Sequence, residues 1–189
     1  MTNRIPAALV VAALALTLAA TGCGESAEPS AAPARRDGAV PEQQFFDYRL
    51  IESSAGVREW ELQSAEMQKY AGRDDVLLVA VKMDFYSEGA HFSVLTADSG
   101  RANLQTHDVH TWGQVVIVTD DGRRLETEEL FFANSTQRIT NEVFNRFTRG
   151  VDVMTGIGLE ATPDLEYIEL KGDVQAEVGD GTDTRGERP

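Results

Sequence analysis

The sequence has few cysteines, few basic residues and no common catalytic motif. It contains one cysteine among 189 residues, so no disulfide can form within the chain. Its 17 Lys and Arg residues stand against 31 Asp and Glu residues, a formal net charge of −14. This charge disfavours nucleic acid as a partner and also an anionic membrane surface, because both attract basic proteins. The sequence has neither a P-loop nor a Gly-x-Ser-x-Gly nucleophile elbow. We therefore predict that the protein is not an enzyme.

Metal chemistry has little support in the sequence. The only close pair of histidines is His107 and His110, with Asp108 beside the first. On a strand, residues three apart point to opposite faces, and no cysteine or further histidine nearby completes a site. We predict no metal, no cofactor and no catalytic residue.

The single cysteine, Cys23, ends a short apolar segment near the N-terminus. Arg4 precedes a mostly apolar run over residues 5–20, shorter than the roughly 20 residues that span a bilayer. A charged start, a short apolar core and small residues before a cut are typical of a secretory signal peptide. The small residues that lead into Cys23 resemble the bacterial lipobox, which implies cleavage before a cysteine that carries a diacylglycerol. We predict a lipoprotein signal peptide over residues 1–22 and lipidation of Cys23; an ordinary signal peptide is the alternative.

Composition divides the rest of the chain into three parts. Residues 23–43 combine small residues, prolines and scattered charges, which cannot build a core. They predict a flexible linker with a reach of roughly 25 Å. Residues 44–178 form the predicted folded domain. The Gly-, Asp- and Arg-rich residues 179–189 are predicted to be a disordered tail.

Within the domain the dominant hydrophobic period is two. Apolar and polar residues alternate over residues 79–85 and again over 168–170, which predicts strands with one buried face. Asp-Ser-Gly at 98–100 and Asp-Asp-Gly at 120–122 are hairpin signals between such runs. Residues 136–149 also fit a short helix, but their β-branched and Asn residues favour an extended or irregular structure. The pattern predicts an all-β sandwich or open barrel.

Several segments, in this order, resemble the LptC family, the periplasmic bridging component of lipopolysaccharide export. Trp60-Glu61-Leu62-Gln63-Ser64 is similar to the family's aromatic-x-Leu-x-Ala strand, with Ser64 at the usual alanine. Residues 113–118 are similar to its glycine-led, valine-rich strand, and residues 121–130 to the hairpin return that follows. Residues 155–174 are similar to its Gly-x-Gly turn and closing strand. The similarity covers roughly residues 45–178.

The resemblance implies an all-β fold, an open antiparallel β-jellyroll of V-shaped stacked sheets. It also implies transport of lipopolysaccharide across the periplasm. The acyl chains would slide along the apolar interior, received from an inner-membrane ABC transporter complex and passed to an LptA-like jellyroll protein. Many family members carry an uncleaved transmembrane helix where this chain has Cys23. We expect the lipid anchor to hold the protein on the periplasmic side of a membrane, the inner rather than the outer.

Apolar residues at inward positions are the candidates for the lipid-binding interior, because Met and aromatic side chains adapt to irregular apolar ligands. The alternative for each of them is ordinary core packing. The candidates are Trp60, Leu62, Val79, Val81, Met83, Phe85, Phe92, Val94, Trp112, Val116, Val118 and Phe132.

The last strand is the candidate for partner docking. Ile168, Leu170 and Val174 continue the apolar alternation up to the tail, and an open sheet edge accepts another chain by strand addition. Two other functions remain open. The first is a periplasmic lipid or lipoprotein chaperone of another fold, and the second is a structural lipoprotein with a filled core.

Overall fold

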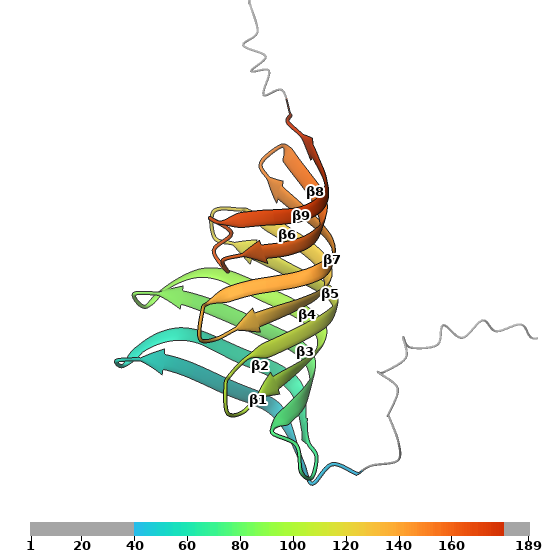
Figure 1. The fold of residues 1–189 in the computed structure, drawn as a ribbon. Coiled ribbons are helices and arrows are strands. Elements are labelled where there is room, and N and C mark those ends of the chain that lie inside the picture. The colour runs from blue at the N-terminus through green and yellow to red at the C-terminus, as the bar shows by residue number, and fades with distance from the viewer. Residues whose placement is uncertain (1–39, 180–189) are drawn as a thin grey trace, which may run out of the picture. The chain divides into compact units, whose positions relative to one another are not determined.

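A computed structural model describes residues 40–179, and these residues form nine β-strands and no helix (Figure 1). The strands are β1 (Gln43–Ser54), β2 (Val57–Lys69), β3 (Asp75–Ser87), β4 (Ala90–Asn103), β5 (Val109–Thr119), β6 (Arg124–Ala133), β7 (Arg138–Arg149), β8 (Asp152–Ala161) and β9 (Ile168–Glu177). The described residues therefore contain no helix long and apolar enough to cross a membrane. The predicted signal peptide, Cys23, most of the linker and the tail from residue 180 lie outside the described residues.

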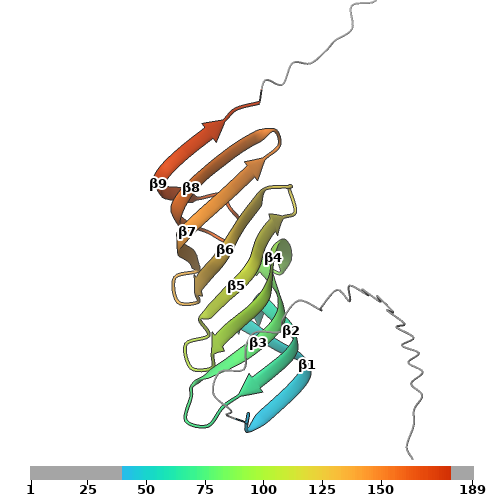
Figure 2. The same cartoon turned by 90° about the vertical axis from the view of Figure 1, so that its right-hand side faces the viewer.

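The strands form one antiparallel sheet in sequence order, β1 to β9 (Figure 2). Each strand pairs only with its neighbours along the chain, and short turns with Gly at positive φ, such as Gly56 and Gly89, join them. The all-β, open antiparallel fold is thus confirmed. Residues 138–149 are strand β7, so the prediction of an extended segment is confirmed, although the apolar spacing there also fits a helix.

A bend runs across the middle of the sheet, strand after strand, and Figure 1 shows the strands curving along one side of the stack. At the bend the cross-strand register shifts in every pair from β4–β5 to β8–β9. Residues there adopt positive φ, including Asp47 (52°), Ala80 (53°), Gly113 (78°) and Gly158 (74°). Bulges of this kind kink a strand and increase its twist, so each strand consists of two arms.

The bend folds the sheet into two facing layers. We call layer A the arms over residues 48–64, 81–96, 115–127 and 145–155, and layer B the arms over 66–79, 99–112, 129–141 and 157–172. In a flat sheet β2 and β6 would lie about 19 Å apart, four strand spacings. The rings of Trp60 on β2 and Phe132 on β6 have centroids only 6.2 Å apart. The two layers therefore enclose a common core.

Candidate lipid-binding interior and sheet edges

Aromatic side chains from both layers fill the centre of the interior. Phe132 of layer B contacts Phe85 of layer A, with ring centroids 5.3 Å apart, as well as Trp60. All three side chains are at most 1% exposed. The indole N–H of Trp60 donates to Asn134 Oδ1 at 2.8 Å, so its polar atom is satisfied where the β6–β7 turn covers it. The interior is apolar and close-packed at its centre.

Half of the predicted interior residues point into this core. These are Trp60, Leu62, Val81, Met83, Phe85 and Phe132, all buried. Phe92, which is half-buried, also reaches the core, because it lies at the irregularity of the β3–β4 pair and its ring stacks on Phe85 at 6.2 Å. Whether any of them contacts lipid stays a prediction.

The interior positions predicted for Val94, Val116 and Val118 are wrong. The buried residues are instead their neighbours Leu95 and Ile117, at 1% and 0% exposed. Since strand side chains alternate between faces, the three valines lie on the outer face of layer A, half-buried. Residues 115–118 are all apolar, so the sequence offers no polar position from which to read the phase of the strand.

Two misplacements remain, and they have different causes: the bend explains Val79, whereas Trp112 shares the wrong phase of Val116 and Val118, since the buried residues of β5 keep one alternation along its whole length. On β3 the inward residues are Leu78 before the bend and Val81 after it, because Ala80 at positive φ shifts the alternation by one residue. Val79 therefore faces outward. On β5 the buried residue is Thr111, and Trp112 lies half-buried on the outer face of layer B beside His110, their rings 5.3 Å apart.

The C-terminal end of the interior opens into a cavity of about 280 Å³. Phe147, Met154, Leu165 and Ile168 supply its apolar lining, with charged residues such as Arg149 at the rim. Sequence reasoning missed this cavity. Leu165 lies in the β8–β9 turn, and no strand period could have marked it as an inward residue.

The N-terminal end of the interior is incompletely covered. Tyr48 and Leu50 of β1 pack against the core but are only half-buried, and Phe45 is 49% exposed. Partial burial raises the pKa of the Tyr48 hydroxyl, so this group is neutral at physiological pH. Apolar surface is thus available at both ends of the core.

Both edges of the sheet are free within the described residues, since β1 pairs only with β2 and β9 only with β8. On β9, Ile168 and Leu170 are half-buried and Val174 is 53% exposed. The β8–β9 register shifts beside Gly172, and Asp173 has a φ of 49°, so a bulge interrupts this edge. Free edges with apolar side chains are typical sites of strand addition.

A family model described as lipopolysaccharide-assembly, LptC-related, matches residues 8–178, nearly the whole chain. The chain belongs to the LptC-related family. This family has a role in lipopolysaccharide transport in the periplasm, is associated with the inner membrane, and consists of transport rather than catalytic proteins. No curated protein matches the chain.

The histidines of this LptC-related domain are each placed beside a carboxylate. His107 Nδ1 lies 2.8 Å from Glu52, and His110 Nε2 lies 3.6 Å from Glu129. Asp108 accepts a hydrogen bond from the Asn134 backbone N–H at 2.9 Å instead of joining them. Among residues 40–179, no group of three or more His, Cys, Asp or Glu is arranged to hold a metal ion.

Proposed function

We propose that the domain carries lipopolysaccharide across the periplasm with the acyl chains in its interior and the sugars in water. It would receive the lipid from an inner-membrane ABC transporter complex at one edge of the sheet. It would pass the lipid to an LptA-like jellyroll protein at the other. Membership of the LptC-related family supports this proposal, as do the two free edges at the ends of a continuous apolar core.

The observation that carries the proposal is the C-terminal cavity. It joins the core directly, since Phe147 and Leu165 belong to both, and it ends at residues 176–178 beside the free edge of β9. An acyl chain leaving the core there would meet whatever strand is added to β9. The predicted edge residues Ile168 and Leu170 stand at this same end, and Ile168 lines the cavity.

We also propose that lipidated Cys23 anchors the domain to the inner membrane. The lipobox-like run supports the anchor, and the association of the family with the inner membrane supports the location. The linker then allows the sheet to stand away from the bilayer by roughly 25 Å.

The packed centre of the core favours one alternative, a structural lipoprotein with a filled interior. For transport, an acyl chain must replace contacts that the two layers make with each other. Met67 and Met83 in the core, and Met154 beside it, have the flexible side chains that suit such repacking. The other alternative, a periplasmic lipid or lipoprotein chaperone of another fold, would need helices to close its sheet, and the described residues form none.

A pair of phenylalanines on β7 allows a matched test. Phe147 lines the cavity and is 7% exposed, whereas Phe144, three residues away, is 57% exposed. We would place benzoylphenylalanine at each position in the full chain and irradiate cells. We expect capture of lipopolysaccharide from position 147 and none from position 144. Equal capture, or capture at neither position while the domain remains folded, would leave the filled-core lipoprotein.

A further inference from the structure

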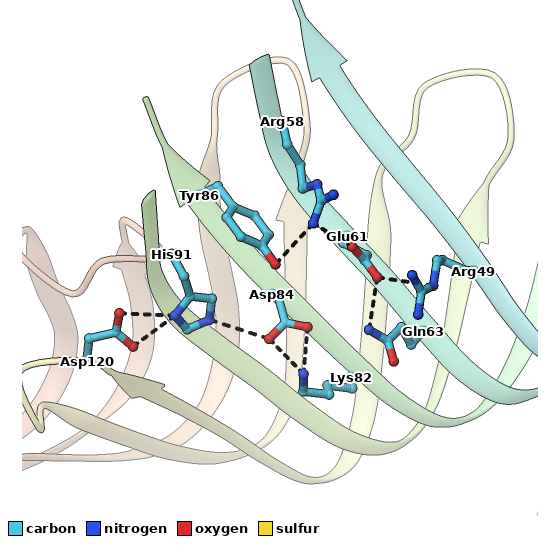
Figure 3. Close-up of polar contacts among 9 residues, drawn as sticks. All are labelled: Arg49, Arg58, Glu61, Gln63, Lys82, Asp84, Tyr86, His91 and Asp120. Carbon is cyan, nitrogen blue, oxygen red and sulfur yellow. Dashed lines mark hydrogen bonds and ion pairs between the residues drawn. The ribbon is translucent and has the colours of Figure 1, made fainter. Parts of the chain in front are cut away.

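The outer face of layer A carries a cluster of charged residues, drawn in Figure 3, in which the acids Glu61 and Asp84 are buried. Glu61 accepts from Arg49 Nε at 3.2 Å and from Arg58 Nη1 at 2.9 Å. The Glu61 side chain is 5% exposed, whereas those of Arg49 and Arg58 are 60% and 43% exposed. One carboxylate thus lies beneath two guanidinium groups.

The neighbouring strands repeat this arrangement. Asp84 lies opposite Glu61 in the β2–β3 register, and Lys82 Nζ donates to it at 2.7 Å. The Asp84 side chain is 10% exposed and that of Lys82 is 48% exposed. His91 Nε2 lies 3.4 Å from the same carboxylate, with its ring 33% exposed. What this part of the surface presents to water is mainly positive charge.

The cationic surface continues across the sheet. The register places Arg49, Gln63, Lys82, Thr96, Val116, Glu126 and Arg146 in one row over β1 to β7. The adjacent row includes Arg124 on β6, whose side chain is 44% exposed. Glu126 and, at the turn beside His91, Asp120 are acids that remain exposed there, at 41% and 57%. We call Arg49, Arg58, Lys82, Arg124 and Arg146 the basic face.

An apolar strip lies between the two ends of the basic face. Val94 and Val118 are cross-strand partners, and Val116 is the next outward residue on β5. These are the three valines that the sequence had placed in the interior. Lys82 precedes the strip on β3, and Arg124 and Arg146 follow it on β6 and β7.

The outer face of layer B has a more acidic set of charges. Its strands carry Glu66, Glu129, Glu160 and Glu169, together with the cations Arg101, Arg138 and Lys171. The formal net charge of −14 therefore averages over two unlike faces. The expectation that the protein avoids an anionic surface was drawn from the net charge alone, and the charge of layer A has to be considered by itself.

We propose that layer A lies with its basic face against the anionic phospholipids of a bilayer. Its five cations lie on five strands, β1, β2, β3, β6 and β7, and none of them lines the C-terminal cavity. A binding groove for an acidic peptide would instead gather its cations in one hollow. Lys and Arg side chains at separate positions can each attract a lipid phosphate, because phospholipids move laterally in the bilayer. The valines between them would lie at the membrane–water interface. The contact concerns the outer face and does not depend on what the interior carries.

The test uses the full chain on vesicles, with or without its anchor, and asks which face meets lipid. Benzoylphenylalanine replaces either Thr96, exposed in the middle of the basic face, or Phe131, 40% exposed on layer B. We expect phospholipid capture at position 96 on phosphatidylcholine vesicles containing phosphatidylglycerol, weak capture on pure phosphatidylcholine, and loss at high salt. Position 131 should capture little phospholipid on either kind of vesicle, although its native residue, Phe131, is more apolar than Thr96.

Charge variants provide the matched control. Arg49→Gln with Arg146→Gln should raise the anionic lipid needed for half-maximal capture at position 96 about 25-fold, since each cation near such a surface contributes about fivefold. Arg101→Gln with Lys171→Gln makes the same change in net charge on layer B and should leave capture unchanged. Equal effects of the two pairs, capture independent of phosphatidylglycerol, or no capture at position 96 would overturn the proposal. If position 96 captures a protein and no phospholipid when cells are irradiated, the face binds a protein partner instead.

Discussion

Asn145 is a polar residue that is completely buried at the bend, where its side chain forms several hydrogen bonds. Its amide nitrogen donates to Asn141 Oδ1 at 2.9 Å and to the Val143 carbonyl at 2.7 Å. Asn141 donates to the Glu129 carbonyl at 2.9 Å, and Thr127 Oγ1 to the Phe144 carbonyl at 2.9 Å. The register shifts between β6, β7 and β8 lie in this region, and a buried carbonyl left without a ladder partner would be costly. These short polar side chains therefore stabilise the bend.

The sequence could predict that residues 136–149 are not a helix, but it could not predict that two asparagines are buried at the bend. The asparagines correctly argued against a helix over residues 136–149. Their burial could not be predicted, because their partners are backbone carbonyls that become available only where the register shifts. A polar residue on a strand is ordinarily assigned to the outer face, and the rule fails where a bulge supplies partners inside.

Ser93 provides the opposite case and a first prediction. It is 0% exposed, and its hydroxyl has no hydrogen-bond partner among the described groups. Ser93→Ala should therefore raise the free energy of unfolding by about 1 kcal/mol, because no hydrogen bond is lost and a desolvated hydroxyl is removed. Urea unfolding of the full chain measures this.

Ser64→Ala is the control, since the Ser64 hydroxyl is also buried but donates to the Glu66 carbonyl at 3.2 Å. This second variant should lose stability. Equal destabilisation by both substitutions would show that the Ser93 hydroxyl forms a hydrogen bond in the folded protein.

At the scale of the strand, two features decide which predictions from sequence succeeded: the bend, and the presence of polar residues that mark the outer face. Away from the bend, the period of two identified Trp60, Leu62, Met83 and Phe85 as inward residues. Across it, strands such as β3 and β6 change phase, since the inward residues are Leu78 and then Val81 on β3, and Thr127 and then Leu130 on β6. A glycine within a strand, such as Gly158 on β8, is the sequence signal that could have revealed the change, and its φ in the structure is 74°.

Gly113 tests the bend. Its φ is 78°, and a Cβ atom there would lie 2.9 Å from Asp98 Oδ2 and 3.0 Å from Asp98 Cβ. Gly113→Ala should lower the free energy of unfolding by about 2 kcal/mol through backbone strain and this contact. Gly122, in the β5–β6 turn, has a φ of 89° and open space around its Cβ position. Gly122→Ala therefore carries the backbone strain alone, and an equal loss in both variants would show that close approach to Asp98 contributes nothing.

The second arm of β9 tests the docking edge. Val174 and the three residues after it are exposed, so they add little to the core. A stop codon after Asp173 should leave the unfolding midpoint nearly unchanged and abolish pull-down of an LptA-like jellyroll protein, because strand addition requires the backbone of an edge strand. A stop codon after Gly179 removes only the tail and should change neither. Retained pull-down after the first truncation would move the docking site to β1.

For the whole molecule, the predicted anchor determines where the domain works. Cys23→Ser removes the only side chain that could carry the diacylglycerol, so we expect the protein in the soluble fraction or with its signal peptide uncleaved. Fractionation together with the intact mass measures both outcomes. A normally processed wild-type chain whose mass includes no acyl groups would exclude the lipid anchor.

Every strand of the sheet pairs with its neighbours in the sequence and with no other strand in the described residues. A hairpin could therefore be inserted into or deleted from the gene without rewiring any other pairing. The length of the structure would then change in fixed steps of two strand spacings, about 10 Å. Such a sheet can also be completed from one end, so the first strands to leave a secretion channel find their partners before the last have been translocated. The number of hairpins therefore determines the length of the domain, and the domain can fold in the order in which its strands are translocated.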